Sequence, residues 1–230
     1  STPLPLPDMV PLDKEEAYCL GVITGDGCIT GSHVEITCSS LDVLSQVQKH
    51  WGKRPVYQRS NCWDIRYYDK VLVERLLRWG FPQGKKEDKL SIPLPIAKGS
   101  METIAAFIAG LLDTDGHADP DRNRIRLVTA SPHLATQVRF LLGLLGIPSG
   151  QTVSLPTGRG KLKTYTIQIA NTAVDDLLER VGPYMIRKER WDCLRTPERH
   201  SHGDILPWTW SDTKKVSGVN IDTIHKRTPA

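Results

Sequence analysis

The 230-residue sequence has no apolar run that approaches the roughly 18 residues of a membrane-spanning helix. It also has no basic segment followed by an apolar one at its start. The opening stretch, "STPLPLPDMVPL", instead indicates an extended, proline-rich lead-in over residues 1–12. We therefore expect no membrane partner.

Cysteine is scarce: there are five cysteines, an odd number, and no CxxC pair. This pattern favours free thiols in a reducing compartment, so we expect an intracellular protein of the cytoplasm, the nucleoid or an organelle. The stretch "TGRGKLKT" lacks the spacing of a phosphate-binding loop. The net charge of +4 permits a nucleic-acid partner without requiring one.

What the sequence does contain is an internal repeat. A shift of 89 positions places Ala17, Gly21, Asp26 and Gly27 on Ala106, Gly110, Asp115 and Gly116. The shift grows along the chain, which fits longer hairpin loops in the second copy. We expect a lead-in (1–12), a first repeat (13–89), a linker (90–100), a second repeat (101–195) and a tail without assigned role (196–230).

Each copy predicts the same element order, αββαββα, in which the first strand is short. Helical periodicity covers 13–25, 41–51 and 69–80 in the first copy, and 101–115, 133–145 and 171–181 in the second. Alternating strands cover 33–39, 54–60 and 62–68, then 124–130, 151–155 and 162–169. We therefore predict an α+β fold with two pseudo-symmetric repeats and antiparallel sheets.

An aspartate near the end of the first helix of each copy is unusual, because a helix C-terminus carries partial negative charge. Gly27 and Gly116 follow Asp26 and Asp115, and we expect both glycines to adopt the left-handed conformation. Small residues one turn apart on each helix allow close packing of two backbones. The predicted helix interface consists of Gly21, Gly25, Gly110 and Thr114. Parallel packing would bring the two aspartates together, where hard oxygen ligands favour Mg²⁺.

At these residues the chain resembles the LAGLIDADG homing endonucleases. The motif copies are "CLGVITGDG" (residues 19–27) and "IAGLLDTDG" (108–116). Two motifs in one chain resemble the monomeric, double-motif members, and "EDKLSIPLP" resembles the intein-type domains. The sixth motif position, often acidic in the family, is Thr24 in one copy and Asp113 in the other.

The resemblance implies a site-specific endonuclease that breaks both strands of a long DNA target with Mg²⁺ or another divalent cation such as Mn²⁺. Its eighth motif position, the metal-binding acid, falls on Asp26 and Asp115. The preceding residues, Gly25 and Thr114, would add main-chain carbonyl ligands. The catalytic lysines would be Lys89, before the Ile-Pro pair, and Lys188, in "MIRKERW".

The strands should form saddle-shaped sheets over the DNA major groove. Successive side chains of a strand point to opposite faces of the sheet, so those that would face the DNA alternate with those that face the core. The DNA-contacting candidates are Thr37, Ser39, Arg59, Arg66, Arg124, Arg126, Arg159, Lys161 and Lys163.

Two alternatives keep the same fold and the same basic sheets. One is a catalytically inactive DNA-binding regulator, and the other is an RNA maturase. Neither needs the paired acids, so the presence of both Asp26 and Asp115 favours the nuclease. We expect a monomer with internal pseudo-twofold symmetry, bound to double-stranded DNA.

Overall fold

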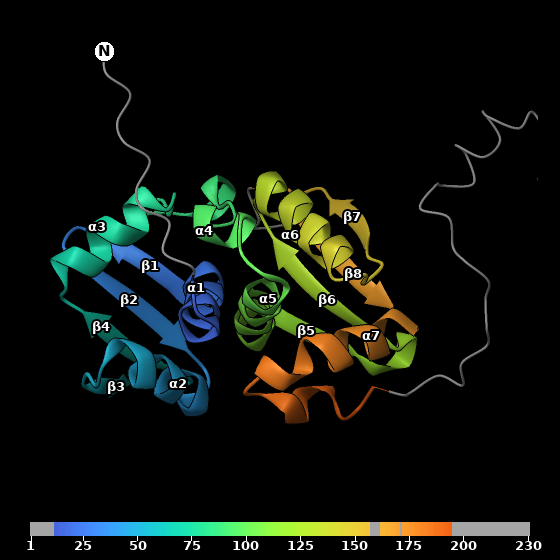
Figure 1. Ribbon diagram of the computed structural model, residues 1–230, viewed down its shortest axis with the longest axis horizontal. Coiled ribbons are helices and arrows are strands. Elements are labelled where there is room, and N and C mark those ends of the chain that lie inside the picture. The colour runs from blue at the N-terminus through green and yellow to red at the C-terminus, as the bar shows by residue number, and fades with distance from the viewer. Residues whose placement is uncertain (1–11, 157–161, 171, 195–230) are drawn as a thin grey trace, which may run out of the picture. The chain divides into compact units, whose positions relative to one another are not determined.

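The two halves of the chain repeat one order of helices and strands in the computed structural model, which describes residues 12–156, 162–170 and 172–194 (Figure 1). The first half comprises α1 (Lys14–Asp26), β1 (Gly27–Thr30), β2 (His33–Cys38), α2 (Leu41–Trp51), β3 (Val56–Gln58), β4 (Trp63–Tyr67) and α3 (Lys70–Arg78). The second comprises α5 (Met101–Asp115), β5 (Gly116–Asp119), β6 (Arg124–Thr129), α6 (Pro132–Leu144), β7 (Gly150–Ser154), β8 (Thr164–Ala170) and α7 (Thr172–Arg180). A short helix, α4 (Leu94–Ala97), lies between them.

Each half contains an antiparallel four-stranded sheet. The strand orders are β1-β2-β4-β3 and β5-β6-β8-β7, so the sheets have the same topology. Gly27 pairs with Ile36 in one sheet, and Gly116 pairs with Leu127 in the other. The predicted α+β class and the duplicated αββαββα order are confirmed.

Side-chain caps explain where the helices begin. A capping side chain accepts a hydrogen bond from the backbone N–H three residues later, which satisfies one of the free donors of the first turn. The caps are Asp13, Ser40, Asp69, Ser100 and Ser131. At the other end, Gly80 and Gly146 have positive φ angles of 96° and 70° just beyond α3 and α6, a conformation that glycine adopts without strain.

The helices α1 and α5 lie side by side between the two sheets (Figure 1). Both are buried on all sides over most of their length, from Glu16 to Thr24 and from Thr103 to Asp113. A Cβ atom on Gly21 would lie 2.2 Å from the carbonyl oxygen of Phe107, and one on Gly110 would lie 2.2 Å from that of Tyr18. The two backbones are therefore in direct contact.

The prediction of left-handed glycines after these helices is wrong. Gly27 has φ −93° and Gly116 has φ −69°, because each helix passes directly into an extended strand. Space requires glycine at both positions. A Cβ on Gly27 would lie 2.6 Å from Ile23 Cα, and one on Gly116 would lie 2.4 Å from the carbonyl oxygen of Leu112.

The segment expected to be a linker contributes to the core. Leu90, Ile92 and Ile96 are buried, and the backbone N–H of Ile92 donates to Gln137 Oε1 at 2.8 Å. The tail, 196–230, lies outside the described residues. None of the described helices combines the length and the apolar character needed to cross a membrane.

Candidate active site

Asp26 and Asp115 are the last residues of α1 and α5, at the ends of the two central helices. The helix ends touch, because a Cβ on Gly25 would lie 2.1 Å from Thr114 Oγ1 and 3.3 Å from Asp115 Cγ. The tight pairing of the helices therefore brings the carboxyl group of one repeat against the backbone of the other.

Ionisation of the two carboxyl groups is disfavoured at this place. Burial and, to a smaller extent, the nearby charge of Asp26 raise the pKa of Asp115 to about 6, against the opposing effects of Lys86 and Arg190. Burial also raises the pKa of Asp26, against the opposing effects of the Cys38 thiol and of Lys86. The side chain of Asp115 keeps an exposed side, so its burial by neighbouring protein atoms is partial. Two such acids at two helix C-termini form a site that attracts cations.

Lys86 supplies one positive charge at this site. Its Nζ donates to the carbonyl oxygen of Thr24 at 2.9 Å and also to that of Gly25, so it caps the end of α1. Burial lowers the pKa of Lys86, and the charges of Asp115 and Asp26 oppose that effect. Lys86 thus balances both the helix dipole and the carboxylates.

Two arginines serve the end of α5 in the same way. Arg190 donates to the carbonyl oxygen of Asp113 at 3.1 Å and to that of Gly116. Arg187 donates to the Asp113 carbonyl at 3.2 Å and to Ser39 Oγ, in the other repeat, at 3.3 Å. Each central helix therefore ends against a cation from the last part of its own repeat.

The structure does not bring the predicted lysines, Lys89 and Lys188, to these contacts, and both are exposed. Lys86 and Arg190 lie there instead. Sequence reasoning missed them because "GKKEDK" and "MIRKERW" each hold three cations within a few residues. No periodicity distinguishes one cation from its neighbours in such a segment.

The acids fit a divalent cation that draws part of its coordination from water and substrate. Mg²⁺ is usually bound through one or two carboxylates together with substrate phosphates. Asp26 and Asp115 supply that number of hard oxygen ligands, and across the described residues there is no cluster of three or more His, Cys, Asp or Glu side chains that could hold a metal. The carbonyl of Gly25 accepts a hydrogen bond from Lys86, and its role as a metal ligand stays a prediction. Thr114 uses its hydroxyl within α5, donating to Leu111 O at 2.9 Å.

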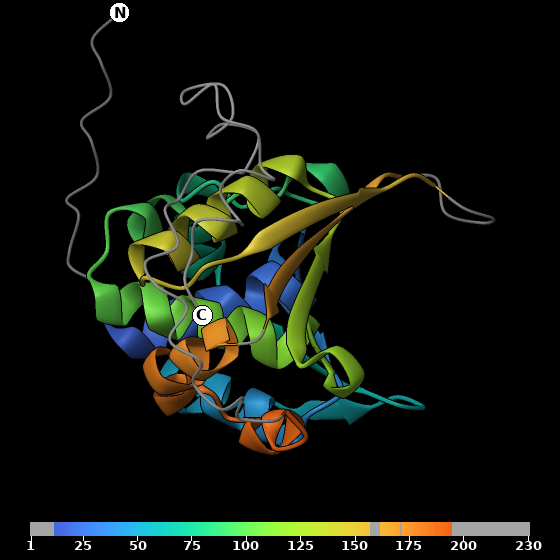
Figure 2. The same cartoon turned by 90° about the vertical axis from the view of Figure 1, so that its right-hand side faces the viewer.

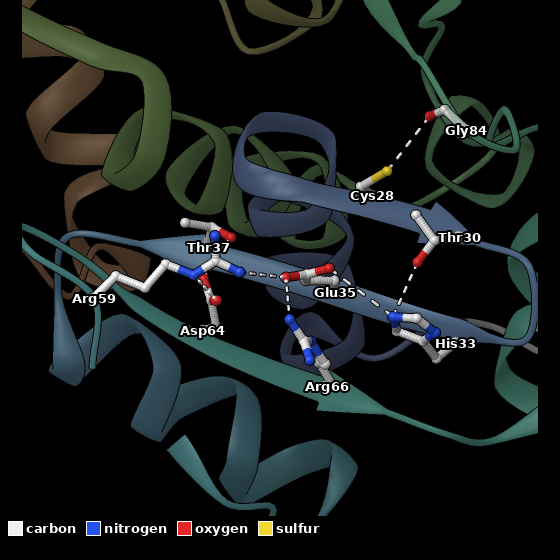
Figure 3. A network of polar contacts seen from close by, with 9 residues as sticks. All are labelled: Cys28, Thr30, His33, Glu35, Thr37, Arg59, Asp64, Arg66 and Gly84. Carbon is white, nitrogen blue, oxygen red and sulfur yellow. Dashed lines mark hydrogen bonds and ion pairs between the residues drawn. The ribbon is translucent and has the colours of Figure 1, made fainter. Parts of the chain in front are cut away.

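The outward face of the first sheet carries an ion-pair network (Figure 3). Glu35 accepts from Arg66 at 3.1 Å and from Arg59 at 3.3 Å. Asp64, which is only 2% exposed, accepts from Thr37 at 2.8 Å and pairs with Arg59. The candidates Thr37, Arg59 and Arg66 thus lie in one network with two acids.

The second sheet has a corresponding network. Arg124 donates to Asp119 Oδ2 and to Gln168 Oε1, both at 2.8 Å, and Arg126 lies 3.8 Å from Asp119. Lys163 is exposed just before β8. Arg159 and Lys161 lie outside the described residues.

Comparison with known proteins matches residues 102–182 to the LAGLIDADG-like domain. Among curated relatives, an A-type ATP synthase protein of Pyrococcus abyssi is 26% identical over 62% of this chain. The DNA-directed RNA polymerase protein Rpo1C of Methanocaldococcus jannaschii is 26% identical over 64%, and the ribonucleoside-diphosphate reductase protein NrdEB of Bacillus subtilis is 29% identical over 68%. The chain spans only 14%, 18% and 17% of these proteins, respectively.

Solved structures show the same architecture. Mesophilic variants of the homing endonuclease I-DmoI align with a TM-score of 0.53 at 19% identity, over 73% of this chain and 95% of that chain. I-DmoI in complex with DNA and Mn aligns with a TM-score of 0.50 at 20% identity, over 75% and 97%. The N-terminal LAGLIDADG domain of WhiA aligns with a TM-score of 0.50 at 14% identity, over 74% and 83%. Together with the duplicated sheets and the paired central helices, these likenesses show that the chain has the LAGLIDADG fold, with a LAGLIDADG-like domain at residues 102–182.

Proposed function

We propose that the protein is a site-specific DNA endonuclease that hydrolyses both strands of a long target with a divalent cation, Mg²⁺ or Mn²⁺. The observation that carries this proposal is the meeting of Asp26 and Asp115 at two adjoining helix ends, with Lys86 and Arg190 beside them. An acid pair in such an unfavourable position is better explained by a bound cation than by helix stability.

Asp26 and Asp115 would hold the cation, which when bound supplies an activated water and neutralises charge on the phosphodiester. Lys86 and Arg190 keep positive charge next to the acids, so a phosphate that enters the site meets cations already in place. The side chains of Lys86 and Arg190 are held by hydrogen bonds to main-chain carbonyls. They therefore need little rearrangement when negative charge develops on the phosphate.

The arginines of both sheets would bind the DNA. Their guanidinium groups are held in place by Glu35, Asp64 and Asp119, which limits the conformational entropy lost on binding. I-DmoI, which shares the fold, has been crystallised with DNA and Mn, and a variant of it has been crystallised with its target DNA in the presence of Mg. This likeness supports double-stranded DNA as the partner and a single chain as the binding unit.

The names of the curated relatives support a mobile origin. Similar segments occur in an ATP synthase, an RNA polymerase and a ribonucleotide reductase, each time as a small fraction of the protein. Proteins of such different function have no common reason to share a DNA-cleaving domain. An inserted element of the intein type accounts for this distribution.

A cleavage screen on a randomised DNA library with Mg²⁺ tests the proposal. Wild-type protein should cut a defined sequence, and Asp26→Asn and Asp115→Asn should each lose cleavage while they still bind the selected DNA. Asp121→Asn, in an exposed turn before β6, is the matched control and should cut normally. Full cleavage by either active-site variant would overturn the proposed chemistry.

A DNA-binding regulator without catalysis is the second candidate. The likeness to the LAGLIDADG domain of WhiA favours it, since this fold is not confined to proteins named as endonucleases. The same screen separates the two candidates. Selective binding by wild-type protein without cleavage in Mg²⁺ or Mn²⁺ would establish the regulator.

A further inference from the structure

The outward face of the sheet β5-β6-β8-β7 has one uncharged row of side chains across three strands. Val128 on β6 pairs with Thr166 on β8, and Thr166 pairs with Thr152 on β7. We call these three residues the methyl row, because each carries at least one methyl group. Val128 is 47% exposed and Thr152 is exposed, so the row is open to a ligand.

The neighbouring row is polar and fixed. Arg126 pairs with Gln168 across β6 and β8. The Gln168 amide accepts from Arg124 at 2.8 Å and donates to Thr152 Oγ1 at 3.0 Å. Because the Thr152 hydroxyl is engaged by Gln168, this threonine has its methyl group left for an apolar contact.

The equivalent row of the other sheet has a different chemistry. There Thr37 pairs with Asp64, and Asp64 pairs with Tyr57. Asp64 is buried, and both of its carboxylate oxygens are engaged, by Thr37 and by Arg59. A carboxylate thus takes the place that Thr166 has in the methyl row, so the two sheets present different groups at matching positions.

We propose that the methyl row reads the 5-methyl group of a pyrimidine, thymine or 5-methylcytosine, in the major groove. This inference rests on the proposed DNA-binding function. Base edges in the major groove expose one apolar group, the thymine methyl, and aliphatic side chains contact it. The adjacent Arg124 and Arg126 supply the positive charge that draws the duplex to this face.

The test begins with selection of bound sequences from a random duplex library, without divalent cations so that no cleavage occurs. Each thymine of the selected site is then replaced by deoxyuridine, which removes only the methyl group. We expect this replacement to weaken binding at one position, or at two adjacent positions, in one half-site, by about four-fold for each methyl group removed. Cytosine at such a position should bind weakly, and 5-methylcytosine should restore part of the affinity.

Val128→Ala should abolish the difference between thymine and deoxyuridine at that position. Figure 2 shows β7 (yellow) beside β8 (orange). Val153→Ala, on β7, is the matched control: Val153 is 53% exposed, but pairs with Tyr165 on the opposite face of the sheet. It should retain the full discrimination. Thermal unfolding of both variants should match the wild type, because both valines are exposed.

The outcomes separate this inference from the proposed function. The protein could bind DNA selectively without any position at which deoxyuridine weakens binding, or the effect of deoxyuridine could persist in Val128→Ala. Either result would overturn the methyl-reading role alone. Failure to bind any duplex would overturn the proposed function and this inference together.

Discussion

The hydroxyl group of Tyr18 donates a hydrogen bond of 2.7 Å to Oδ2 of Asp113, across the interface of α1 and α5. Asp113 also accepts from the backbone N–H of Ile186 at 2.7 Å and of Arg187 at 3.2 Å. One buried carboxylate therefore ties both central helices to the segment that carries Arg187 and Arg190. Thr24, at the same motif position in the first copy, donates only to Leu20 O within its own helix, at 2.7 Å.

Tyr18→Phe removes this hydroxyl group and keeps the ring. Burial already raises the pKa of Asp113, and loss of a donor to a buried carboxylate costs about 1.5–3 kcal/mol. We expect a fall in the free energy of unfolding of that size, measured by urea titration. Tyr57→Phe is the control, because Tyr57 is 56% exposed. Equal stability of Tyr18→Phe and the control would show that Asp113 does not depend on Tyr18.

Gly21→Ala should force α1 and α5 apart. The added Cβ would lie 2.2 Å from the carbonyl oxygen of Phe107 and 2.8 Å from the backbone nitrogen of Leu111, and neither backbone atom can turn aside. We expect a loss of about 3 kcal/mol or more in the free energy of unfolding, together with loss of cleavage.

The control for this substitution is Gly143→Ala in α6. A Cβ there meets no atom within 4 Å, and the site is exposed. Alanine should stabilise this helix by about 0.5–1 kcal/mol. A Gly21→Ala protein as stable as the wild type would show that the helix backbones need not approach this closely.

The sequence predicts those parts of the structure that depend on local pattern. Small residues one turn apart on two duplicated helices indicate the contact between Gly21 and Gly110, and the paired aspartates follow from it. Lys86 was not predictable in this way, because it meets the carbonyl of Gly25 across 61 residues of chain. A parallel bridge between Ile29 and Gln83, and the hydrogen bond from Gly84 N to Ile29 O at 2.8 Å, bring its segment there.

The conformation of Gly27 marks a second limit. A glycine after a helix indicates a left-handed residue, yet here the chain continues into β1 with a negative φ. The reason for glycine is the closeness of Ile23, which depends on the direction in which the chain leaves the helix. Sequence reasoning had no information about that direction.

Lys86→Met and Lys89→Met form a matched pair for testing the catalytic cation. Lys86 lies at the carboxylates, whereas Lys89 is exposed three residues away. Removal of one preorganised donor that stabilises negative charge in a transition state costs about 10²–10³ in rate. We expect a loss of that size for Lys86→Met and a nearly unchanged rate for Lys89→Met, in single-turnover assays on the selected target. The reverse order would assign the role to Lys89, as the family resemblance implies.

Asp115→Asn should stabilise the protein when no divalent cation is present. Burial and Asp26 raise the pKa of Asp115 from 3.8 to about 6, so between these values the folded state binds more protons than the unfolded state. The contribution of Asp115 to the free energy of unfolding is therefore fully present below about pH 3.8 and is lost as the pH rises through about 6.

In Asp115→Asn this loss of stability with rising pH is absent, because asparagine does not ionise. Because Asp115 is exposed on one side, solvent screening reduces the effect, and we expect a gain of about 1 kcal/mol at pH 7.5 that shrinks toward zero near pH 4. Thermal unfolding in EDTA at both pH values measures it, with an expected shift in Tm of about 2–4 °C at pH 7.5. Mg²⁺ should reverse the order by binding the folded wild type more tightly than the variant. A variant less stable than the wild type at pH 7.5 in EDTA would show that the ionised Asp115 carboxylate does not destabilise the metal-free protein.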